Sequence, residues 1–390
     1  MSQATFHTDF TLNGKGFATS KELLRFSSSL SKEAFLFLSA WFDTNDFIEV
    51  QTSGSTGTPT SISLKKEYMV NSAQATGAYF ELPQKTTALL CLSPKYIAGK
   101  MMLVRAMVLG WALDMVEPAS CPLDHTEKTY DFCAMVPLQL ANSLSQLYRI
   151  KKLIVGGASV SNELIEKLQE FPTRVFATYG MTETITHVAI KKLNHLDVSS
   201  TSNVGFDCQP DNVIQAGAQP DIDVPSSEVE MLNNGSGERS YYNTLPNVKI
   251  STDTRGCLVI DAPGISDTKI ITKDMVELIS DTEFQWLGRY DTIINSGGIK
   301  LIPEQIEKKL AAVIDSRFFV AGIPDKLLGE KLVLIVESEN SDDDILNKVK
   351  NLTALSKYEI PKKIFYIPEF IETGTKKIQR RQTLDLIFNK

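Results

Sequence analysis

The sequence predicts an α/β fold with a large N-terminal domain of βαβ layers, a small β subdomain within it, and an α+β C-terminal domain. Three observations lead to this prediction. Apolar runs of strand length alternate with helical stretches over the first half of the chain, as in parallel βαβ units whose helices cover both faces of a sheet. Short strand-type runs then follow one another, and the last quarter again mixes helices with strands.

The first half supplies the alternating elements. The run Ala88–Leu92 is continuously apolar, which is typical of a strand buried on both faces. Pro137 suits the first turn of a helix, where its missing N–H is not needed. We expect helices at Lys21–Trp41, Lys65–Phe80, Ala98–Leu109, Leu138–Tyr148 and Asn162–Glu170, and strands at Phe47–Gln51, Ala88–Leu92, Leu113–Val116, Phe132–Val136, Leu153–Val155 and Arg174–Thr178.

The second half has a different character. Between about residues 200 and 287, short runs such as Cys257–Ile260 and Val276–Ile279 are separated by Gly, Asp and Asn, which predicts antiparallel strands. We expect a boundary near Gly288–Asp291, so that residues 1–287 form the N-terminal domain and residues 288–390 the C-terminal domain. In the latter we expect helices at Pro303–Ile314 and Asp342–Leu355, and strands at Phe318–Val320, Leu332–Val336 and Ile364–Ile367.

Composition excludes several classes of protein. Forty basic against forty-seven acidic side chains give a net charge of −7, which argues against a nucleic-acid binder. The five cysteines contain no Cys-x-x-Cys pair, so a reducing compartment fits best. Residues 1–10 do not resemble a secretory signal, and charges interrupt the most apolar stretch, Tyr96–Val116. We expect a cytoplasmic protein without stable membrane insertion; the sequence leaves its oligomeric state open.

A glycine- and hydroxyl-rich loop, Thr52–Thr60, directly follows a predicted strand. Its donors and its two glycines suit a polyphosphate, because they allow a close approach to the backbone. It is not a P-loop, since it lacks Gly-Lys-Ser/Thr. By composition alone it could equally be a flexible polar hairpin. The residues concerned are Thr52, Ser53, Gly54, Ser55, Thr56 and Gly57.

More segments of this kind follow in one order. Gly156, Gly157 and Ala158 come directly after a predicted strand, where a nucleotide can approach the carboxyl end of a parallel sheet. A second strand is followed by an aromatic ring, a hydroxyl and a carboxylate within five residues. The segments further along the chain are Tyr179–Glu183, Asp274, Gly288–Asp291, Ser296–Glu304 and Gly374–Arg381.

In this order and spacing, the segments resemble the acyl-adenylate-forming (AMP-binding) superfamily of acyl- and aryl-CoA ligases, luciferases and adenylation domains. The resemblance spans residues 47 to about 384. It implies a large N-terminal domain and a mobile C-terminal domain. It also implies ATP-dependent activation of a carboxylic acid to an acyl-AMP, with Mg²⁺, followed by transfer of the acyl group to coenzyme A.

The resemblance also gives the motifs of the N-terminal part their roles. The Thr52–Thr60 loop would hold the β- and γ-phosphates of ATP. Gly156, Gly157 and Ala158 would line the adenine, with Tyr179 against its ring and Gly180 beside it. Thr182 would contact the α-phosphate and Glu183 would hold Mg²⁺. Asp274 would bind both ribose hydroxyls, a natural use of a carboxylate that accepts two O–H groups.

Further along the chain the resemblance concerns catalysis and domain rotation. Arg289 would lie near the ribose and phosphate, and Asp291 would be the hinge. Lys377 would be the catalytic lysine, with Lys376 as the alternative, because positive charge is needed where charge builds up on the α-phosphate. After rotation, the Gly297-Gly298 loop would lie beside a tunnel for a thiol.

Taken singly, some of these residues have ordinary explanations. Glu183 could cap a turn, Asp274 could be a surface acid, Lys377 lies in a basic run, and His187 could be an ordinary partly buried histidine. Register with the family favours the functional interpretation for the first three. One departure stands out: Thr60 follows Pro59 where the family usually has a lysine, and Lys65 or Lys66 is the nearest cation that could replace it.

Within the superfamily, Tyr96–Arg105 and Ala134–Gln139 look most like the o-succinylbenzoate–CoA ligases of menaquinone synthesis. The alternatives are another aryl- or acyl-CoA ligase, or a catalytically degenerate nucleotide-binding protein. The second carboxylate of o-succinylbenzoate would enter the pocket charged, which requires a cation or several donors there. Lys100 and Arg105 lie about 140° apart around the predicted helix, so at most one faces inward. By the resemblance this helix borders the acyl pocket, and we expect Lys100, with Tyr96 and His187, to line it; the alternative is that both cations are solvated.

Overall fold

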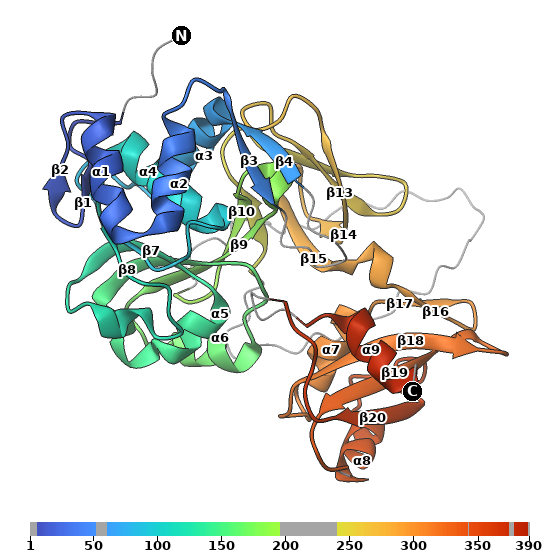
Figure 1. Cartoon of the computed structure of the whole chain (residues 1–390). Helices are drawn as coiled ribbons and strands as arrows, with labels where there is room; N and C mark the ends of the chain where they lie inside the picture. Colours follow the sequence, from blue (N-terminus) through green and yellow to red (C-terminus); the bar gives the residue numbers. More distant parts are fainter. Residues whose placement is uncertain (1–5, 52–60, 196–239, 342, 374–377, 389–390) are drawn as a thin grey trace, which may run out of the picture.

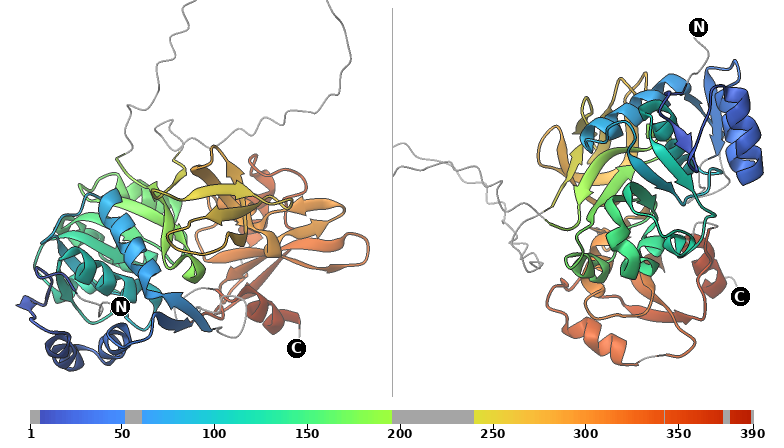
Figure 2. Two further views of the ribbon diagram at one scale, coloured as in Figure 1. Left: turned by 90° about the horizontal axis from the view of Figure 1, so that it is seen from above. Right: turned by 90° about the vertical axis from the view of Figure 1, so that its left-hand side faces the viewer.

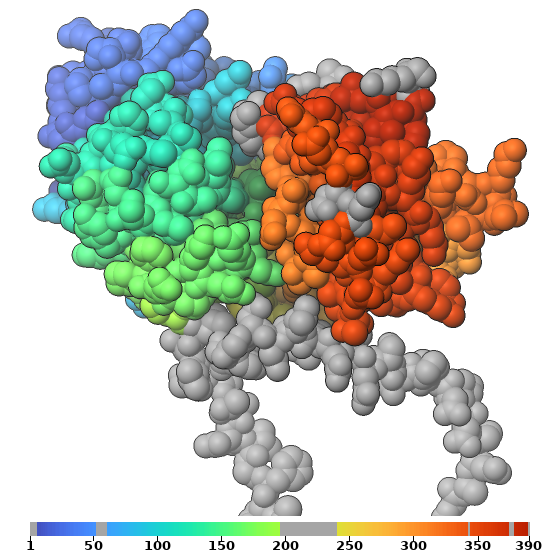
Figure 3. All heavy atoms as spheres, turned by 90° about the horizontal axis from the view of Figure 1, so that it is seen from below, coloured from blue at the N-terminus to red at the C-terminus, as the bar shows by residue number. Residues whose placement is uncertain are grey.

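The computed structural model describes residues 6–51, 61–195, 240–341, 343–373 and 378–388. Figure 1 shows two units: the chain as far as β15, and the C-terminal residues from β16 onward. The strands of the described residues form a thirteen-stranded sheet, a five-stranded sheet and the two-stranded pair β3–β4. In the space-filling view of Figure 3, the blue-to-green and orange-to-red parts meet along a seam.

The first part of the chain alternates helices and strands as predicted. The strand Phe47–Gln51 has the predicted bounds, and the helices at residues 66–79, 97–109 and 162–168 lie within a few residues of theirs. The elements are β1 Thr11–Leu12, β2 Lys15–Gly16, α1 Ser20–Leu30, α2 Lys32–Trp41, β3 Phe47–Gln51, β4 Ser61–Lys65, α3 Lys66–Tyr79, β5 Thr87–Leu90, α4 Ile97–Leu109, β6 Ala112–Met115, η1 Pro122–His125, β7 Tyr130–Met135, α5 Pro137–Asn142, η2 Leu144–Arg149, β8 Ile150–Val155, α6 Asn162–Leu168, β9 Arg174–Gly180, η3 Thr182–Thr184 and β10 His187–Lys192.

Two predicted helices are each divided. The prediction of one helix over Lys21–Trp41 is wrong, because Ser31 has extended backbone (φ −156°) and its hydroxyl accepts from the Ala34 N–H, 3.3 Å away. That hydroxyl caps α2, so the chain stops one helix and starts another. The stretch after Pro137 likewise changes from α5 to the 3₁₀ helix η2 at Ser143.

The parallel core of the large sheet has the order β9-β8-β7-β5-β6. Its strands are buried on both faces. In β7, Phe132 and Ala134 pack into the cluster that holds the α1–α4 side chains, while Cys133 and Met135 pack against the other cluster, which contains residues of α5 and α6. Figure 2 shows helices on both sides of these strands. The predicted βαβ layering is confirmed.

The antiparallel strands of the next region are confirmed, and they continue the same sheet. β11 pairs with β10 (Ile190 opposite Asn243) on one side and with β15 on the other. The order then runs β15-β14-β13-β12, with every pair antiparallel. Their bounds are β11 Tyr242–Thr244, β12 Lys249–Thr252, β13 Cys257–Asp261, β14 Ile270–Leu278 and β15 Glu283–Arg289.

The C-terminal unit is built on the five-stranded sheet. A 3₁₀ turn, η4, separates the end of β15 from β16, at the boundary expected near Gly288–Asp291; the domain division itself stays a prediction. The helix predicted over Pro303–Ile314 ends at Leu310, and the last helix, α9, was not predicted. The elements are η4 Tyr290–Thr292, β16 Ile294–Ser296, β17 Ile299–Leu301, α7 Pro303–Leu310, β18 Phe318–Asp325, β19 Gly329–Glu337, α8 Asp343–Asn351, β20 Lys363–Ile367 and α9 Arg380–Phe388.

Candidate functional site

Two predicted nucleotide-binding segments lie at the carboxyl ends of neighbouring parallel strands. Gly156–Ala158 follows β8, and Tyr179 and Gly180 end β9. Gly157 has φ +86°, a conformation that side chains rarely adopt. A Cβ on Gly156 would lie 2.5 Å from the Thr178 hydroxyl, so the two strand ends approach closely. The sheet therefore brings these two segments side by side.

The end of β9 also packs closely against β10. Gly180 lies opposite His187 at a register shift, and a Cβ on Gly180 would collide with the backbone carbonyl of Thr186. Only glycine fits there. The chain then forms the short turn η3, in which Thr182 is half-buried and Glu183 is exposed. One exposed carboxylate suits a nucleotide-bound Mg²⁺, which takes one or two carboxylates and completes its shell with phosphates and water.

Asp274 is the centre of a buried polar group. The Tyr179 hydroxyl donates to its Oδ2 (2.8 Å), and the Trp286 indole N–H donates to its Oδ1 (3.2 Å). Asp274 is only 7% exposed, so the interpretation as one of many surface acids is wrong. Burial, together with the neighbouring carboxylate, raises the pKa of Tyr179, which therefore stays protonated and a donor. Sequence reasoning missed Trp286.

Two aromatic rings hold the Tyr179 side chain in place. Its ring centroid lies 5.2 Å from that of Phe284 and 5.9 Å from that of Tyr242, in edge-on geometry. Phe284 and Tyr242 are themselves stacked. The aromatic group joins the parallel strand β9 to the antiparallel strands β11 and β15.

Arg289 links Asp274 to the predicted hinge. It lies opposite Asp274 in the β14–β15 register, with Nη1 3.9 Å from Asp274 Oδ1. Its Nε and Nη2 donate to Asp291 at 3.0 and 2.9 Å, and the Lys273 ammonium lies 3.4 Å from the same carboxylate. These cations hold the pKa of Asp291 below its usual range. Asp274, Arg289 and Asp291 thus form one continuous network of charged side chains.

Among the described contacts, His187 pairs with Arg105 rather than with the expected Lys100; the lining of an acyl pocket by Lys100, Tyr96 and His187 stays a prediction. Arg105 is 1% exposed, and its Nη2 lies 3.5 Å from His187 Nδ1 and 3.4 Å from the Thr186 hydroxyl. Lys100 instead donates to the carbonyls of Pro94 (2.9 Å) and Lys95 (2.7 Å). Tyr96, which precedes α4, is 37% exposed. As expected from their angular separation, only one of the two helix cations is fully buried.

Hydrogen bonding determines the tautomer of His187. The Thr76 hydroxyl, on α3, donates its proton to the Ser72 carbonyl (3.0 Å) and lies 3.3 Å from His187 Nε2 and 3.2 Å from Arg105 Nε. Since that hydroxyl proton is already used, Nε2 must carry the imidazole hydrogen, and Nδ1 accepts from Arg105. Burial, and to a smaller extent the charge of Arg105, lowers the pKa of His187 well below 6.5. His187 is therefore a neutral acceptor for the guanidinium.

Every partner of Arg105 in the described part of the chain is uncharged. Besides Thr76, Thr186 and His187, its Nη1 faces the Met102 sulfur at 3.7 Å. Burial lowers the pKa of Arg105 to about 9, so the guanidinium still carries its charge at neutral pH. A buried cation without a carboxylate partner among the described residues is unusual.

Two of the predicted motifs lie outside the described residues. The residues Thr52, Ser53, Gly54, Ser55, Thr56 and Gly57 belong to the loop between β3 and β4, whose flanks Gln51 and Ser61 pair. Both replacement cations are engaged elsewhere: Lys66 pairs with Asp43 at 2.8 Å, and Lys65 with Asp267. Lys376 and Lys377 also lie outside the described residues, between Glu372 and Ile378, which form an antiparallel bridge.

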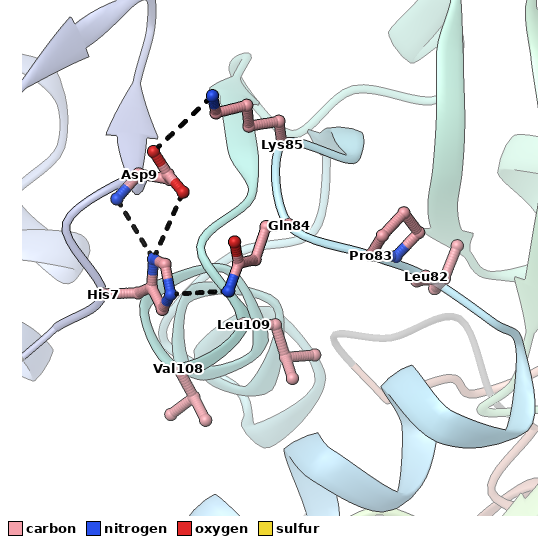
Figure 4. A pocket seen from close by; sticks show the side chains of 8 residues that line it. All are labelled: His7, Asp9, Leu82, Pro83, Gln84, Lys85, Val108 and Leu109. Atoms are coloured by element: carbon pink, nitrogen blue, oxygen red, sulfur yellow. Dashed lines mark hydrogen bonds and ion pairs between the residues drawn. The ribbon is translucent and has the colours of Figure 1, made fainter.

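A surface hollow of about 680 Å³ lies away from these motifs (Figure 4). Its polar groups bind one another, since His7 contacts Asp9 and Gln84, and Lys85 lies 3.8 Å from Asp9. None of the predicted site residues belongs to it. Its lining residues are His7, Asp9, Leu82, Pro83, Gln84, Lys85, Val108 and Leu109.

Two further features are absent from the described residues. They contain no group of three or more His, Cys, Asp and Glu side chains arranged to hold a metal ion. They also contain no helix that combines the length and the apolar character needed to span a membrane.

Comparison with known proteins gives four informative likenesses. Residues 41–214 match the family described as AMP-binding enzyme. A solved structure of an acyl-CoA synthetase (AMP-forming)/AMP-acid ligase II-like protein from Dyadobacter fermentans is 34% identical, with a TM-score of 0.54, and the match covers 91% of this chain and 93% of that one.

The other two likenesses are more distant. The 2-succinylbenzoate–CoA ligase of Escherichia coli (strain K12) is 24% identical over 340 residues, and the match covers 85% of this chain but 66% of that protein. The chain therefore spans about two thirds of that relative's length. An o-succinylbenzoate coenzyme A synthetase from Bacillus subtilis, solved with ATP and magnesium ion, shares the fold at 18% identity, with a TM-score of 0.65 and coverage of 94% and 82%.

Proposed function

The chain belongs to the AMP-binding enzyme family of acyl-CoA synthetases, and on that premise we propose that it is an o-succinylbenzoate–CoA ligase of the kind used in menaquinone synthesis. It would use ATP to convert the acid to an acyl-AMP and then transfer the acyl group to coenzyme A. Support for the general reaction comes from the family, and support for the acid comes from the named relative and from the buried Arg105.

The observation that carries the choice of acid is the buried Arg105. A fatty acid or benzoate has one carboxylate, which is consumed in the reaction. A dicarboxylate keeps a second one, and an unpaired buried charge is expensive unless it meets an opposite charge. Arg105 offers such a charge, with a planar fork of donors that matches a carboxylate. It lies beside Thr186 and His187, the residues packed against Gly180.

The first half-reaction would take place between the Tyr179–Glu183 segment and the C-terminal lysine. One carboxylate oxygen of the acid attacks the α-phosphorus of ATP, an O–P bond forms, and pyrophosphate leaves with the electrons of the broken bond. Positive charge is needed where the transition state gathers negative charge. Lys377, Thr182 and Arg289 would supply donors there, and Mg²⁺ held with Glu183 and the phosphates would neutralise phosphate charge.

The nucleoside would be positioned by the buried group around Asp274. Tyr179 and Trp286 already donate to this carboxylate, so its two oxygens are fixed in orientation. Each oxygen has a further lone pair that a ribose hydroxyl can use. The strand-end glycines Gly156 and Gly157 would leave room for the adenine against the Tyr179 ring.

The second half-reaction would follow a rotation of the C-terminal unit at Asp291. The thiol of coenzyme A attacks the acyl carbonyl, AMP leaves, and the thiol proton passes to solvent or to the departing phosphate. Gly297 and Gly298, which join β16 and β17 with φ +60° and +82°, would flank the thiol path. Their lack of side chains permits a thin chain to pass.

A substrate panel tests the proposal. Acid-dependent ATP–pyrophosphate exchange and CoA-dependent AMP release are measured with o-succinylbenzoate, benzoate and a medium-chain fatty acid. We expect the dicarboxylate to give the highest kcat/KM. Faster turnover of the fatty acid or benzoate would instead identify another aryl- or acyl-CoA ligase, and nucleotide binding without exchange for any acid would identify a degenerate binding protein.

A further inference from the structure

Described residues on the two sides of the segment that carries the predicted catalytic lysine contact each other. Glu372 and Ile378 form an antiparallel bridge across residues 374–377. The Gln379 N–H donates to the Ile371 carbonyl (2.7 Å), and the Gln379 side-chain amide donates to the Glu372 carbonyl (3.1 Å). Whatever fixes Ile378 and Gln379 therefore fixes one end of the lysine segment.

Arg380, the next residue, begins α9 and is held by an ion pair. Its Nη2 donates to Glu307 Oε2 on α7 at 2.7 Å, and its guanidinium lies 5.7 Å from the centre of the Phe319 ring. Its Nη1 lies 3.9 Å from Glu304 Oε1, and it is a buried atom without a hydrogen-bond partner among the described residues. Arg380 thus lies between two carboxylates of one helix.

These two carboxylates reach different parts of the C-terminal unit. Glu307 Oε1 accepts from the Val320 N–H of β18 at 2.9 Å, so this carboxylate is tied to the sheet. Glu304 Oε1 accepts from the Thr292 hydroxyl at 3.1 Å, directly after the predicted hinge residue Asp291. Through Arg380, the lysine segment is connected both to the rigid sheet and to the hinge.

We propose that Arg380 is a positioning residue for acyl-AMP formation: held between Glu304 and Glu307, it fixes the Ile378 end of the bridge and so the approach of the catalytic lysine to the α-phosphate. This inference rests on the proposed function. Arg380 does not touch the reacting atoms. A lysine on a loosened segment would reach the phosphate in fewer of its conformations, and small displacements of a catalytic group reduce rates strongly.

The chain offers a matched control on the same helix. Lys309, also on α7, pairs with Glu359 at 2.8 Å, and the two side chains are 31% and 15% exposed. The Arg380 and Glu307 side chains are 31% and 18% exposed. The two ion pairs are thus equally buried, but in the described contacts only the Arg380 pair adjoins the lysine segment.

The test separates the two half-reactions in Arg380→Met, Arg380→Lys, Glu307→Gln and Lys309→Met. We expect Arg380→Met and Glu307→Gln to lower the kcat of ATP–pyrophosphate exchange by about 10- to 100-fold, with KM for ATP within about twofold of the wild type. Thioester formation from supplied acyl-AMP should stay within about twofold, because the lysine is not used there. Arg380→Lys should restore part of the loss, and Lys309→Met should leave both half-reactions unchanged.

Amide hydrogen exchange at Gln379 gives a readout that needs no activity. We expect it to accelerate in Arg380→Met but not in Lys309→Met, since only the former loosens the bridge. Unchanged exchange, equal loss in both half-reactions, or a higher KM for ATP at unchanged kcat would each overturn the positioning role. Failure of the proposed function is a different result: the wild type would show no pyrophosphate exchange with any acid.

Discussion

Replacement of Arg105 by methionine tests whether the charge of Arg105 serves substrate binding or the stability of the fold. Methionine has a similar length and suits the apolar surroundings of α4, where Met101, Met102 and Leu103 are fully buried. The variant removes the guanidinium and leaves the other described groups in place. If Arg105 stabilises the fold, its loss should lower the free energy of unfolding. If it serves an anionic substrate, its loss should leave that free energy nearly unchanged.

The magnitude follows from the contacts of Arg105. Burial lowers its pKa from 12.5 to about 9, and at about 1.4 kcal/mol per unit this desolvation costs about 5 kcal/mol. The bonds from the charged group to Thr76 and Thr186 return about 1.5–3 kcal/mol each. We therefore expect the free energy of unfolding of Arg105→Met to lie between about 1 kcal/mol below and about 2 kcal/mol above the wild type.

Activity should change far more than stability. Truncation of one partner of a buried charge pair costs about 2–5 kcal/mol, so kcat/KM for o-succinylbenzoate should fall by about 30- to 5000-fold. Benzoate and fatty acids place no second carboxylate beside the guanidinium, and their kcat/KM should be unchanged or higher. The measurements are denaturant unfolding and CoA-dependent AMP release for each acid.

Lys100→Met is the matched control, because Lys100 belongs to the same helix and donates only to backbone carbonyls in the described structure. It should keep the preference among acids. The reasoning fails if the free energy of unfolding of Arg105→Met falls by more than about 3 kcal/mol and the variant shows equal activity on all acids. It also fails if the preference disappears in Lys100→Met but survives in Arg105→Met.

Four further predictions concern the rest of the site. Lys377→Ala should lower acyl-AMP formation by about two to three orders of magnitude while sparing thioester formation from supplied acyl-AMP; a larger effect in Lys376→Ala would move the assignment by one residue. Asp274→Asn should weaken ATP and AMP binding together, since both contain ribose, and unchanged AMP affinity in calorimetry would contradict the ribose role. His187 has a pKa well below 6.5 in the folded protein, so it contributes stability that is present above pH 6.5 and lost as the pH falls; urea unfolding at pH 5 and pH 8 should show a smaller difference in His187→Gln. Asp291→Pro should slow thioester formation more than adenylation, because it restricts the torsions of the hinge, and wild-type overall turnover would place the hinge elsewhere.

The alternation of strands and helices could be predicted because it depends on local pattern. A parallel strand buried on both faces appears as a continuous apolar run, as at β5, and the strands β7, β8 and β9 were also correctly placed. The break at Ser31 was missed because a capping serine looks like any polar residue in an amphipathic helix. The pairing of β10 with β11 depends on contacts between residues far apart in the chain, which periodicity does not show.

The choice between Lys100 and Arg105 shows why a site is harder to predict than a fold. Their angular separation follows from helix geometry, but which one faces inward depends on the orientation of the helix. An amphipathic stripe would have shown that orientation. Helix α4 has none, because its buried residues surround the axis, from Gly99 through Val104 to Met107. Trp286 was missed for a similar reason, since its contact with Asp274 depends on the β14–β15 pairing, in which Trp286 lies opposite Val276.

The continuous sheet also limits where this chain can be recombined with its relatives. The sequence pattern changes near residue 200, which makes that region look like a natural crossover point for chimeras. The β10–β11 pairing and the Tyr179–Asp274 contact cross it, so a crossover there would combine halves of one sheet and one buried polar group from different parents. At η4, between β15 and β16, a crossover leaves both sheets intact. Exchange of C-terminal units between relatives should therefore be attempted at η4, with the contacts of Thr292 and Arg289 conserved.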